Sequence, residues 1–298
     1  MNRWLRRTLW TFAALITLAA ALVALGLLLA HQRAQRPVPA RVVAVAAATD
    51  AAALAQGRYL FETRGCAHCH GADGRGKPLV DGNGMRVVSP AIAPGTGSAT
   101  AAYRSEDWDR AVRHGLKPDG RPLMFMPSQE FNRMTDADLG SLVGYVQSLP
   151  PGTGGKRVLE LPLIVRVLYG WGVFPDSTKG IDHMLPPAAP VAVAASVDHG
   201  RYVAQICVGC HRSNFSGGKV ASGPPSWPAA ADLRPHAGGV MAHYPDAAAL
   251  ARMISSGQSW DGRGLQVMPF ESLRALSPVD IEALHRFLQT LPSKPTSG

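Results

Sequence analysis

The longest apolar run of the chain lies close to its amino terminus. Thr8–Ala30 carries no charged side chain and consists largely of leucine and alanine. As a helix, these 23 residues would be about 34 Å long, enough to cross the roughly 30 Å hydrocarbon core of a bilayer. A cleaved signal peptide is the competing interpretation, but its apolar core is usually only about 7–15 residues long. We therefore expect an uncleaved transmembrane anchor over 8–30 and a cytoplasmic segment over 1–7.

Hydrophobic residues recur at helical spacing in two further segments, one in each half of the chain. The positions are Leu139, Leu142, Val143, Val146 and Leu149, and Ile281, Leu284, Phe287, Leu288 and Leu291. Each segment follows a hydroxyl residue, Thr135 or Ser277, with an aspartate three residues later, as in a capping box. Both end at a proline, which favours termination of a helix. No stretch in either half alternates convincingly between polar and apolar residues, so we expect helices and no strands.

The two segments belong to a longer internal repeat. Residues 57–70 match 200–211, residues 111–128 match 253–270, and residues 145–150 match 287–292. Each half therefore predicts a small helical domain, with a first helix before the cysteines, a middle helix over 105–114 or 246–255, and a last helix.

The repeat and the apolar run together predict an all-α chain of tandem domains. The expected segments are a tether over 31–50, a first domain over 51–150, an interdomain segment over 151–198 and a second domain over 199–298. Within the interdomain segment, the apolar stretch 159–176 is expected to pack across both domains or to lie at the membrane surface.

The net charge of +9 comes mostly from the amino-terminal region. Residues 1–41 contain six arginines and no acidic residue, which leaves only +3 from residue 42 onward. A nucleic-acid-binding domain would show a basic run or patch, and the rest of the sequence has no such run. We therefore expect no nucleic-acid partner.

All four cysteines lie in two Cys-x-x-Cys-His stretches, one in each repeat. The residues are Cys66, Cys69 and His70, and Cys207, Cys210 and His211. Three other roles for the cysteines fit less well. A local disulfide would tie no distant elements together, and a thioredoxin-like redox pair needs a strand–helix context. A zinc site built from two cysteine pairs usually has the pairs about 15–20 residues apart. Covalent haem c explains the order, because two thiols one helical turn apart bond the vinyl groups and the next residue ligates the iron. We expect two covalent haem c groups, with His70 and His211 as iron ligands.

The second iron ligand of each haem is expected from a methionine at matching depth in the repeat. Met126 lies 60 residues after Cys66, Met268 lies 61 residues after Cys207, and each precedes a proline. Met124 is a rival of Met126. The methionines without a repeat partner are expected to be packing residues, namely Met85, Met134, Met241 and Met253. The histidines without one are expected at the surface or in the core, namely His68, His114, His183, His199, His236, His243 and His285. A His/Met pair fills both axial positions, which favours electron transfer over catalysis.

These residues resemble the class I cytochromes c of bacteria. The resemblance covers about 51–150 and 199–292 and is carried by CAHCH, CVGCH, RAVRHGLKPDGRPLMFMP and DLGSLVGYVQSLP. The chain is most similar to membrane-anchored dihaem cytochromes c and to the multihaem cytochrome subunits of periplasmic alcohol and sugar dehydrogenases. Those subunits typically carry three haems, whereas this chain has two motifs.

The resemblance implies particular contacts inside each domain. The first and last helices should cross, with Gly57 against Tyr145 and Gly200 against Phe287. A proline carbonyl should orient each iron-binding histidine, and the nearest candidates are Pro90 and Pro224.

The expected function is electron relay in the periplasm at the bacterial inner membrane. The donor would be a dehydrogenase or a quinol-oxidising complex, and the acceptor an oxidase or a soluble cytochrome. Two alternatives stay open. The chain could be the cytochrome subunit of a periplasmic dehydrogenase complex, or a dihaem enzyme such as a peroxidase or a thiosulfate-oxidising cytochrome.

Overall fold

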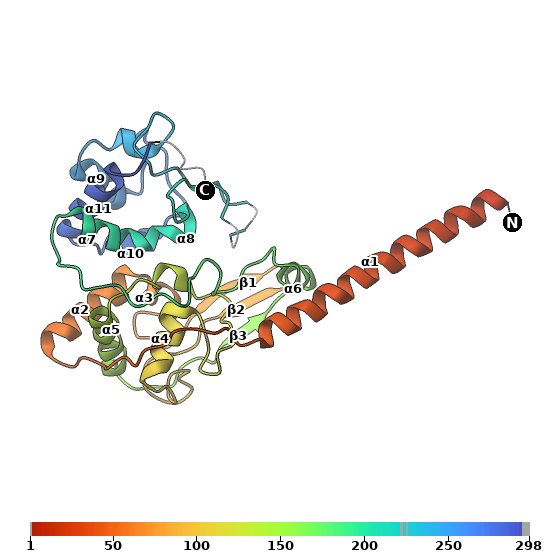
Figure 1. The fold of residues 1–298 in the computed structure, drawn as a ribbon, viewed down its shortest axis with the longest axis horizontal. Coiled ribbons are helices and arrows are strands. Elements are labelled where there is room, and N and C mark those ends of the chain that lie inside the picture. The colour runs from red at the N-terminus through yellow and green to blue at the C-terminus, as the bar shows by residue number, and fades with distance from the viewer. Residues whose placement is uncertain (1, 221–222, 225, 294–298) are drawn as a thin grey trace.

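Two helical domains lie side by side, and one long helix projects from them (Figure 1). The computed structural model describes residues 2–220, 223–224 and 226–293. Met1 of the expected cytoplasmic segment and residues 294–298 of the expected second domain lie outside the described residues. The projecting helix is α1, Arg3–Gln35, and the domains follow it in chain order.

The apolar run forms the greater part of α1. An 18-residue window of this helix has a mean hydropathy of 2.7, and only 6% of that window is buried. The helix is therefore long and apolar enough to cross a membrane. It continues five residues past Ala30, to Gln35, because the polar residues that follow the apolar run still favour helix.

The first domain is built around two crossing helices. Its helical elements are α2 (Ala51–Thr63), α3 (Cys66–His70), α4 (Ser105–His114), η1 (Ser128–Glu130) and α5 (Asp136–Ser148). A Cβ on Gly57 of α2 would lie 2.0 Å from the Ser141 carbonyl oxygen and 2.7 Å from the Tyr145 Cβ. Only glycine allows this approach of α2 to α5, and the expected crossing of Gly57 with Tyr145 is confirmed.

The second domain repeats this arrangement. Its helical elements are α7 (Val197–Val203), η2 (Ala204–Cys207), α8 (Val208–His211), η3 (Val240–His243), α9 (Ala247–Ser256), α10 (Phe270–Leu273) and α11 (Pro278–Gln289). A Cβ on Gly200 would lie 1.9 Å from the Ala283 carbonyl oxygen and 2.8 Å from the Phe287 Cβ. The predicted crossing of α7 with α11 is therefore confirmed.

The expectation of no strands was wrong for the first domain. Strand β1 (Pro78–Gly82) pairs antiparallel with β2 (Met85–Val88), which pairs antiparallel with β3 (Val158–Glu160). The turn between β1 and β2 is Asn83-Gly84, and both residues have positive φ, 51° and 72°. Asn-Gly is the preferred sequence of such two-residue hairpins, so a signal was present but was outweighed by the shortness of the strands.

The segment expected as a tether is extended but lies along the first domain. The backbone N–H groups of Val45 and Ala48 donate to the carbonyls of Ser105 and Gly140, at 3.3 and 3.0 Å. A Cβ on Gly144 would lie 1.9 Å from the Ala48 carbonyl oxygen, so the glycines of α5 form the groove that holds this segment. Helix α1 is thus joined to the first domain by an extended segment that is bound along the surface of that domain.

The last helix of each domain is capped partly by the other domain. As expected, Thr135 and Ser277 accept from the N–H groups of Asp138 and Asp280, each at 3.1 Å. The N–H groups of Thr135 and Ser277 donate to tyrosine hydroxyls of the opposite domain, Tyr202 at 3.2 Å and Tyr59 at 2.9 Å. Those hydroxyls in turn donate to Asp138 and Asp280. Because the aspartates bind these tyrosines, a capping box within one domain is replaced by a contact between domains.

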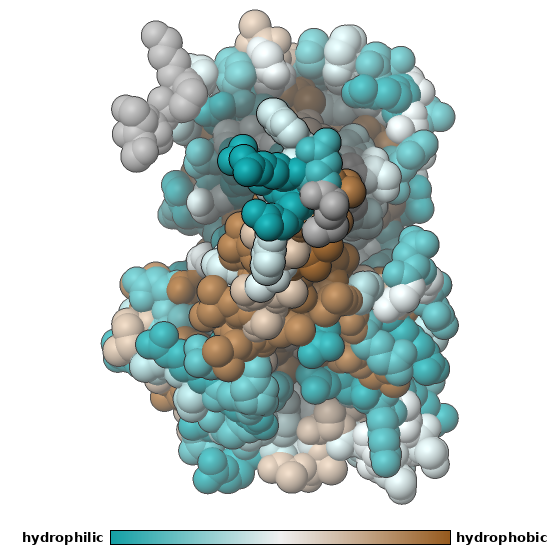
Figure 2. All heavy atoms as spheres, turned by 90° about the vertical axis from the view of Figure 1, so that its right-hand side faces the viewer, coloured by the Kyte–Doolittle hydropathy of each residue, from teal (hydrophilic) through white to brown (hydrophobic). Residues whose placement is uncertain are grey.

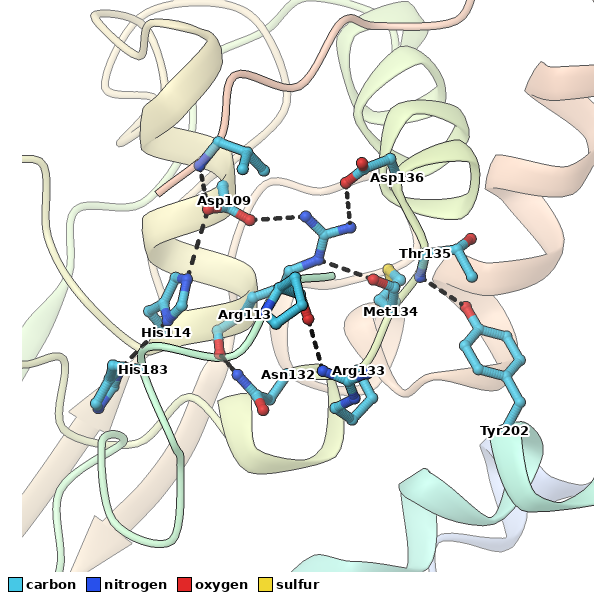
Figure 3. A network of polar contacts seen from close by, with 12 residues as sticks. Asp109, Arg113, His114, Asn132, Arg133, Met134, Thr135, Asp136, His183 and Tyr202 are labelled. Carbon is cyan, nitrogen blue, oxygen red and sulfur yellow. Dashed lines mark hydrogen bonds and ion pairs between the residues drawn. The ribbon is translucent and has the colours of Figure 1, made fainter. Parts of the chain in front are cut away.

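A buried polar network joins α4 to the start of α5 (Figure 3). Arg113 is 1% exposed and donates to Asp109 at 2.8 Å, to the Met134 carbonyl at 2.9 Å and to Asp136 at 2.9 Å. His114, expected in the core or at the surface, is buried and its Nδ1 lies 3.2 Å from Nδ1 of His183. The network fixes the loop that carries Met134 against the domain interior.

Candidate haem sites

The first Cys-x-x-Cys-His stretch opens onto a cavity of about 570 Å³ in the first domain. Helix α3 supplies Cys66, Cys69 and His70 to its wall, and the loop after α4 supplies Met124 and Met126. Most other lining side chains are apolar, including Phe61, Trp108, Leu142, Val143 and, from the small sheet, Val87 and Leu159. An apolar cavity of this size, with two thiols and an imidazole in its wall, fits a haem c group.

Each motif histidine is oriented by a backbone carbonyl. Nδ1 of His70 donates to the Pro90 carbonyl at 2.9 Å, and Nδ1 of His211 donates to the Ala231 carbonyl at 2.7 Å. Burial lowers the pKa of both histidines, and the hydrogen bond to the carbonyl partly opposes this shift. A neutral ring with its proton on Nδ1 leaves the Nε2 lone pair available for a metal.

The Pro90 expectation is confirmed, and the Pro224 expectation was wrong. Ala231 lies 20 residues after His211, the same separation as between His70 and Pro90. A carbonyl oxygen is the only requirement for this hydrogen bond, and any residue supplies one. The position in the repeat therefore predicts the residue that accepts from His211 better than the residue type does.

The loops that carry Met126 and Met268 have the same backbone scaffold. Gly115 and Gly257 end α4 and α9 in the left-handed conformation, and each accepts from the N–H eight residues later, at 2.7 and 2.9 Å. Two residues after each methionine, an N–H donates back to the methionine carbonyl, at 2.9 Å for Met126 and 2.8 Å for Met268. The repeat therefore places the two methionines at the same point of the same loop.

The second motif also lies in apolar surroundings. His211 is 8% exposed, and Cys207 and Met268 both pack against the buried apolar cluster of the second domain. This cluster includes Val203, Phe215, Met241, Leu284 and Phe287. All four cysteines are unpaired, and burial raises the pKa of the Cys66 and Cys207 thiols to about 12. The two sites thus hold neutral thiols in apolar surroundings, which fits one haem c group in each domain.

Basic residues lie at the wall of the first cavity. Lys117 and Arg157 both line it, together with the carboxylate of Asp119. Burial lowers the pKa of Lys117, and the positive charges of Arg157 and Arg121 lower it further, while Asp119 opposes them. An excess of positive charge at the rim of an apolar cavity suits the negatively charged carboxylates of a haem.

The two motif helices face each other's methionine loops across the domain interface. On one side, Nδ1 of His68 lies 3.2 Å from a carboxylate oxygen of Glu271, which is three residues after Met268. On the other side, a Cβ on Gly209 would lie 2.0 Å from Oε1 of Glu130, which is four residues after Met126. The interface therefore has approximate two-fold symmetry and contains both Cys-x-x-Cys-His stretches.

Glu130 is a residue that the sequence did not single out. Burial raises its pKa to about 8, opposed by the nearby Arg64 guanidinium. Its charge would also act on Cys69, Cys207 and Cys210, so the carboxyl lies between the two motifs. The repeat counterpart of Glu130 is a serine, Ser272, so the self-similarity that identified the other site residues carried no signal for it.

The cytochrome c family profile matches residues 54–150 and 197–292, which together are well over half of the chain. The chain therefore belongs to the cytochrome c family, and it has two cytochrome c domains that each bind a covalent haem c. Its single helix long and apolar enough to span a membrane, within the described residues, is α1.

Several characterised relatives share part of this sequence. The chain is 26% identical over 268 residues to the fructose dehydrogenase cytochrome subunit of Gluconobacter japonicus, covering 82% of this chain and 54% of that protein. It is 27% identical over 174 residues to the gluconate 2-dehydrogenase cytochrome c subunit of Pantoea cypripedii, covering 54% of this chain and 38% of that protein. It is also 27% identical over 223 residues to a diheme cytochrome c-type protein of Cereibacter sphaeroides, covering 70% of each. The chain thus spans about half or less of the two dehydrogenase subunits.

Proposed function

We propose that this protein is a membrane-anchored dihaem electron carrier in which the two haem sites exchange electrons through the domain interface. The observation that carries this proposal is the two-fold arrangement in which each Cys-x-x-Cys-His helix lies against the methionine loop of the other domain. The anchor would be α1, which holds both haem domains at the periplasmic face of the inner membrane.

The residues proposed to hold the haems are the ones predicted from the sequence. Cys66 and Cys69 would bond the first haem and Cys207 and Cys210 the second, and His70 and His211 would each ligate an iron. Met126 and Met268 would each supply the second protein ligand of an iron, and Met126 is favoured over Met124 because only Met126 has a repeat counterpart on the same loop scaffold. When bound, each haem supplies a reversible one-electron couple at its iron.

The protein residues have separate tasks in this proposal. The carbonyls of Pro90 and Ala231 fix the tautomer and orientation of the two histidines. The apolar walls exclude water, and a thioether ligand opposite a histidine raises the reduction potential. Lys117 and Arg157 would balance the haem carboxylates of the first site.

Filled axial positions distinguish a carrier from a dihaem enzyme. We expect the matured full-length protein to exchange electrons with an added soluble c-type cytochrome and to show no turnover of peroxide or thiosulfate. Met126→Ala and Met268→Ala serve as positive controls, because opening an axial position should create peroxide turnover. Turnover by the unaltered protein that neither substitution increases would contradict the carrier function and favour a dihaem enzyme.

A second candidate is the cytochrome subunit of a periplasmic dehydrogenase. The similarity to the fructose and gluconate dehydrogenase cytochrome subunits favours it. Purification of the chain from gently solubilised membranes tests this candidate. A dehydrogenase that co-purifies in a fixed ratio and reduces both haems on addition of its substrate would support it, whereas a chain isolated without one favours the independent carrier.

A further inference from the structure

Helix α6 crosses α1 inside the apolar run. Helix α6, Leu163–Gly170, contacts α1 at two glycines. A Cβ on Gly170 would lie 1.9 Å from the Gly26 carbonyl oxygen, and a Cβ on Gly26 would lie 2.8 Å from Nε1 of Trp171. Small residues let two helix backbones approach this closely, which is also a common form of helix packing within membranes. The crossing lies four residues before the last residue of the apolar run, Ala30.

A polar cluster fixes the position of α1 directly beyond this crossing. Arg33 donates to the Tyr169 carbonyl at 3.2 Å, forms an ion pair with Asp176 at 3.3 Å and lies over the Tyr169 ring, 5.0 Å from its centroid. The Tyr169 hydroxyl donates to Asp176 at 3.1 Å. Because Asp176 and Tyr169 are buried in the protein, α1 is held at a defined depth relative to α6.

Helix α6 and the turn that follows it also expose large apolar side chains beside this crossing. Leu163 is 55% exposed, Ile164 61%, Trp171 44% and Val173 59%. Viewed along α1 from its amino-terminal side, apolar residues gather around the place where this helix meets the domains (Figure 2). The stretch 161–175 contains one charged residue, Arg166, and no acid.

We propose that this apolar surface, formed by Leu163, Ile164, Trp171 and Val173, lies in the outer leaflet of the same bilayer that α1 spans. The inference rests on the proposed anchoring by α1. If Thr8–Ala30 spans the hydrocarbon core, Gly26 lies about 6 Å below its periplasmic end, and α6 is carried to the same depth. Exposed apolar side chains at that depth meet lipid, whereas in water they would form an uncovered patch.

The composition of the surface matches the membrane interface. Tryptophan is enriched where the bilayer meets water, and Trp171 stands at the end of α6 beside Gly26. Arg166 can extend its charged end to the headgroups while its aliphatic part stays in the apolar layer. The chain would then hold the membrane with one spanning helix and one helix lying in the interface.

Membrane contact at α6 would set the orientation of the first haem site. Strand β3 ends at Glu160, three residues before α6 begins, and its residues Val158 and Leu159 line the first cavity. The three-stranded sheet lies beside α6 in Figure 1. The sheet wall of the first haem site would therefore lie next to the bilayer surface.

Site-directed spin labelling of the full-length, haem-loaded protein in phosphatidylcholine–phosphatidylglycerol vesicles tests this proposal. Thioether formation uses the native thiols, so single cysteines introduced by Ile164→Cys and Val173→Cys take the label selectively. Leu15→Cys in α1 reports the anchor. Val279→Cys on α11, which lies away from α1 and is 40% exposed, is the water-facing control. Collision of each label is measured with oxygen, which concentrates in lipid, and with a neutral nickel chelate, which stays in water.

The proposal expects labels at 164 and 173 to show an oxygen-to-nickel accessibility ratio several-fold above that at 279, approaching the ratio at 15. The proposal would be overturned if the accessibility ratios at 164 and 173 equalled the ratio at 279 while the label at 15 showed a ratio typical of lipid. That result would leave the proposed anchoring by α1 intact. Low collision with both reagents at 164 and 173 would also overturn it, because a protein partner or a second copy would then cover the surface. A water-like ratio at 15 would instead contradict the proposed anchoring.

Discussion

Tyr59 and Tyr202 occupy equivalent positions of the repeat, and each caps the last helix of the other domain. The Tyr59 hydroxyl accepts from the Ser277 N–H at 2.9 Å, and the Tyr202 hydroxyl accepts from the Thr135 N–H at 3.2 Å. Both follow the glycine–arginine pair at which the first and last helices of a domain cross. The same tripeptide therefore organises the inside of one domain and its contact with the other.

Removal of these hydroxyls should uncouple the domains. Tyr59→Phe and Tyr202→Phe each leave a partly buried N–H without its acceptor and remove one hydrogen bond to an aspartate. The aspartates keep one other partner each, His199 for Asp280 and Gln56 for Asp138. Each substitution should therefore lower the free energy of unfolding by about 1–3 kcal/mol. We expect the double variant to unfold in two transitions where the unaltered protein unfolds in one. Denaturant titration followed at the haem absorbance and by far-ultraviolet circular dichroism measures this.

Tyr244→Phe is a matched control for the same chemical change. Its hydroxyl accepts from the Trp260 N–H at 3.2 Å, and both residues belong to the second domain. This variant should lose stability without separating the transitions. If Tyr244→Phe and the Tyr59/Tyr202 double variant behaved alike, the tyrosines would have no special role between the domains.

The buried carboxyl of Glu130 should make stability fall as pH rises. Its pKa is raised from an ordinary value of 4.5 to about 8 in the folded protein, so the neutral form stabilises the fold. This contribution is complete below about pH 4.5 and is lost as the pH rises through about 8, by an amount on the order of a few kcal/mol. Free energies of unfolding measured between pH 5 and pH 9 should fall less steeply for Glu130→Gln. An unchanged slope would show that the carboxyl is solvated.

Loss of the proposed distal methionines should affect one haem at a time. Met126→Ala and Met268→Ala should each remove about half of a methionine–iron absorption near 695 nm and lower one of two reduction potentials. Met124→Ala and Met134→Ala are controls from the same cavity wall and should leave the band in place. Loss of the band in Met124→Ala, with retention in Met126→Ala, would exchange the assignment between these two neighbours.

A methyl group at the helix crossing should destabilise the second domain. In Gly200→Ala the new Cβ would meet the Ala283 carbonyl oxygen at 1.9 Å, so α7 and α11 must move apart at a cost of about 1–3 kcal/mol or more. The control is Gly264→Ala in the same domain, where no atom lies within 4 Å of the added Cβ and the backbone φ is not left-handed. Thermal unfolding compares the two, and equal midpoints would contradict the close crossing.

The internal repeat made most of this protein predictable from its sequence. It located both cysteine motifs, both methionines and the crossing glycines, because each of these positions has a partner in the other half. The same comparison, applied to the His70 carbonyl contact, would have selected Ala231 instead of Pro224, since a hydrogen bond to a backbone oxygen does not depend on the side chain.

Features that break the repeat were harder to predict. The hairpin around Asn83-Gly84 occurs in one half only, and its strands are too short for a strong alternating pattern. Glu130 also lacks an acidic counterpart, and its importance depends on a contact with Gly209 that only the packing of the two domains creates. The contacts of Tyr59 and Tyr202 with the opposite domain could not be predicted either. Asp138 and Asp280, which these tyrosines bind, fitted a capping box within their own domain equally well.

A potentiometric titration of the matured full-length protein, followed by visible spectra, tests the central claim most directly. Two low-spin haems, each titrating as a one-electron couple and both contributing to the absorption near 695 nm in the oxidised state, are the predicted result. A single haem, or a high-spin component with no absorption near 695 nm, would contradict the assignment of two His/Met sites.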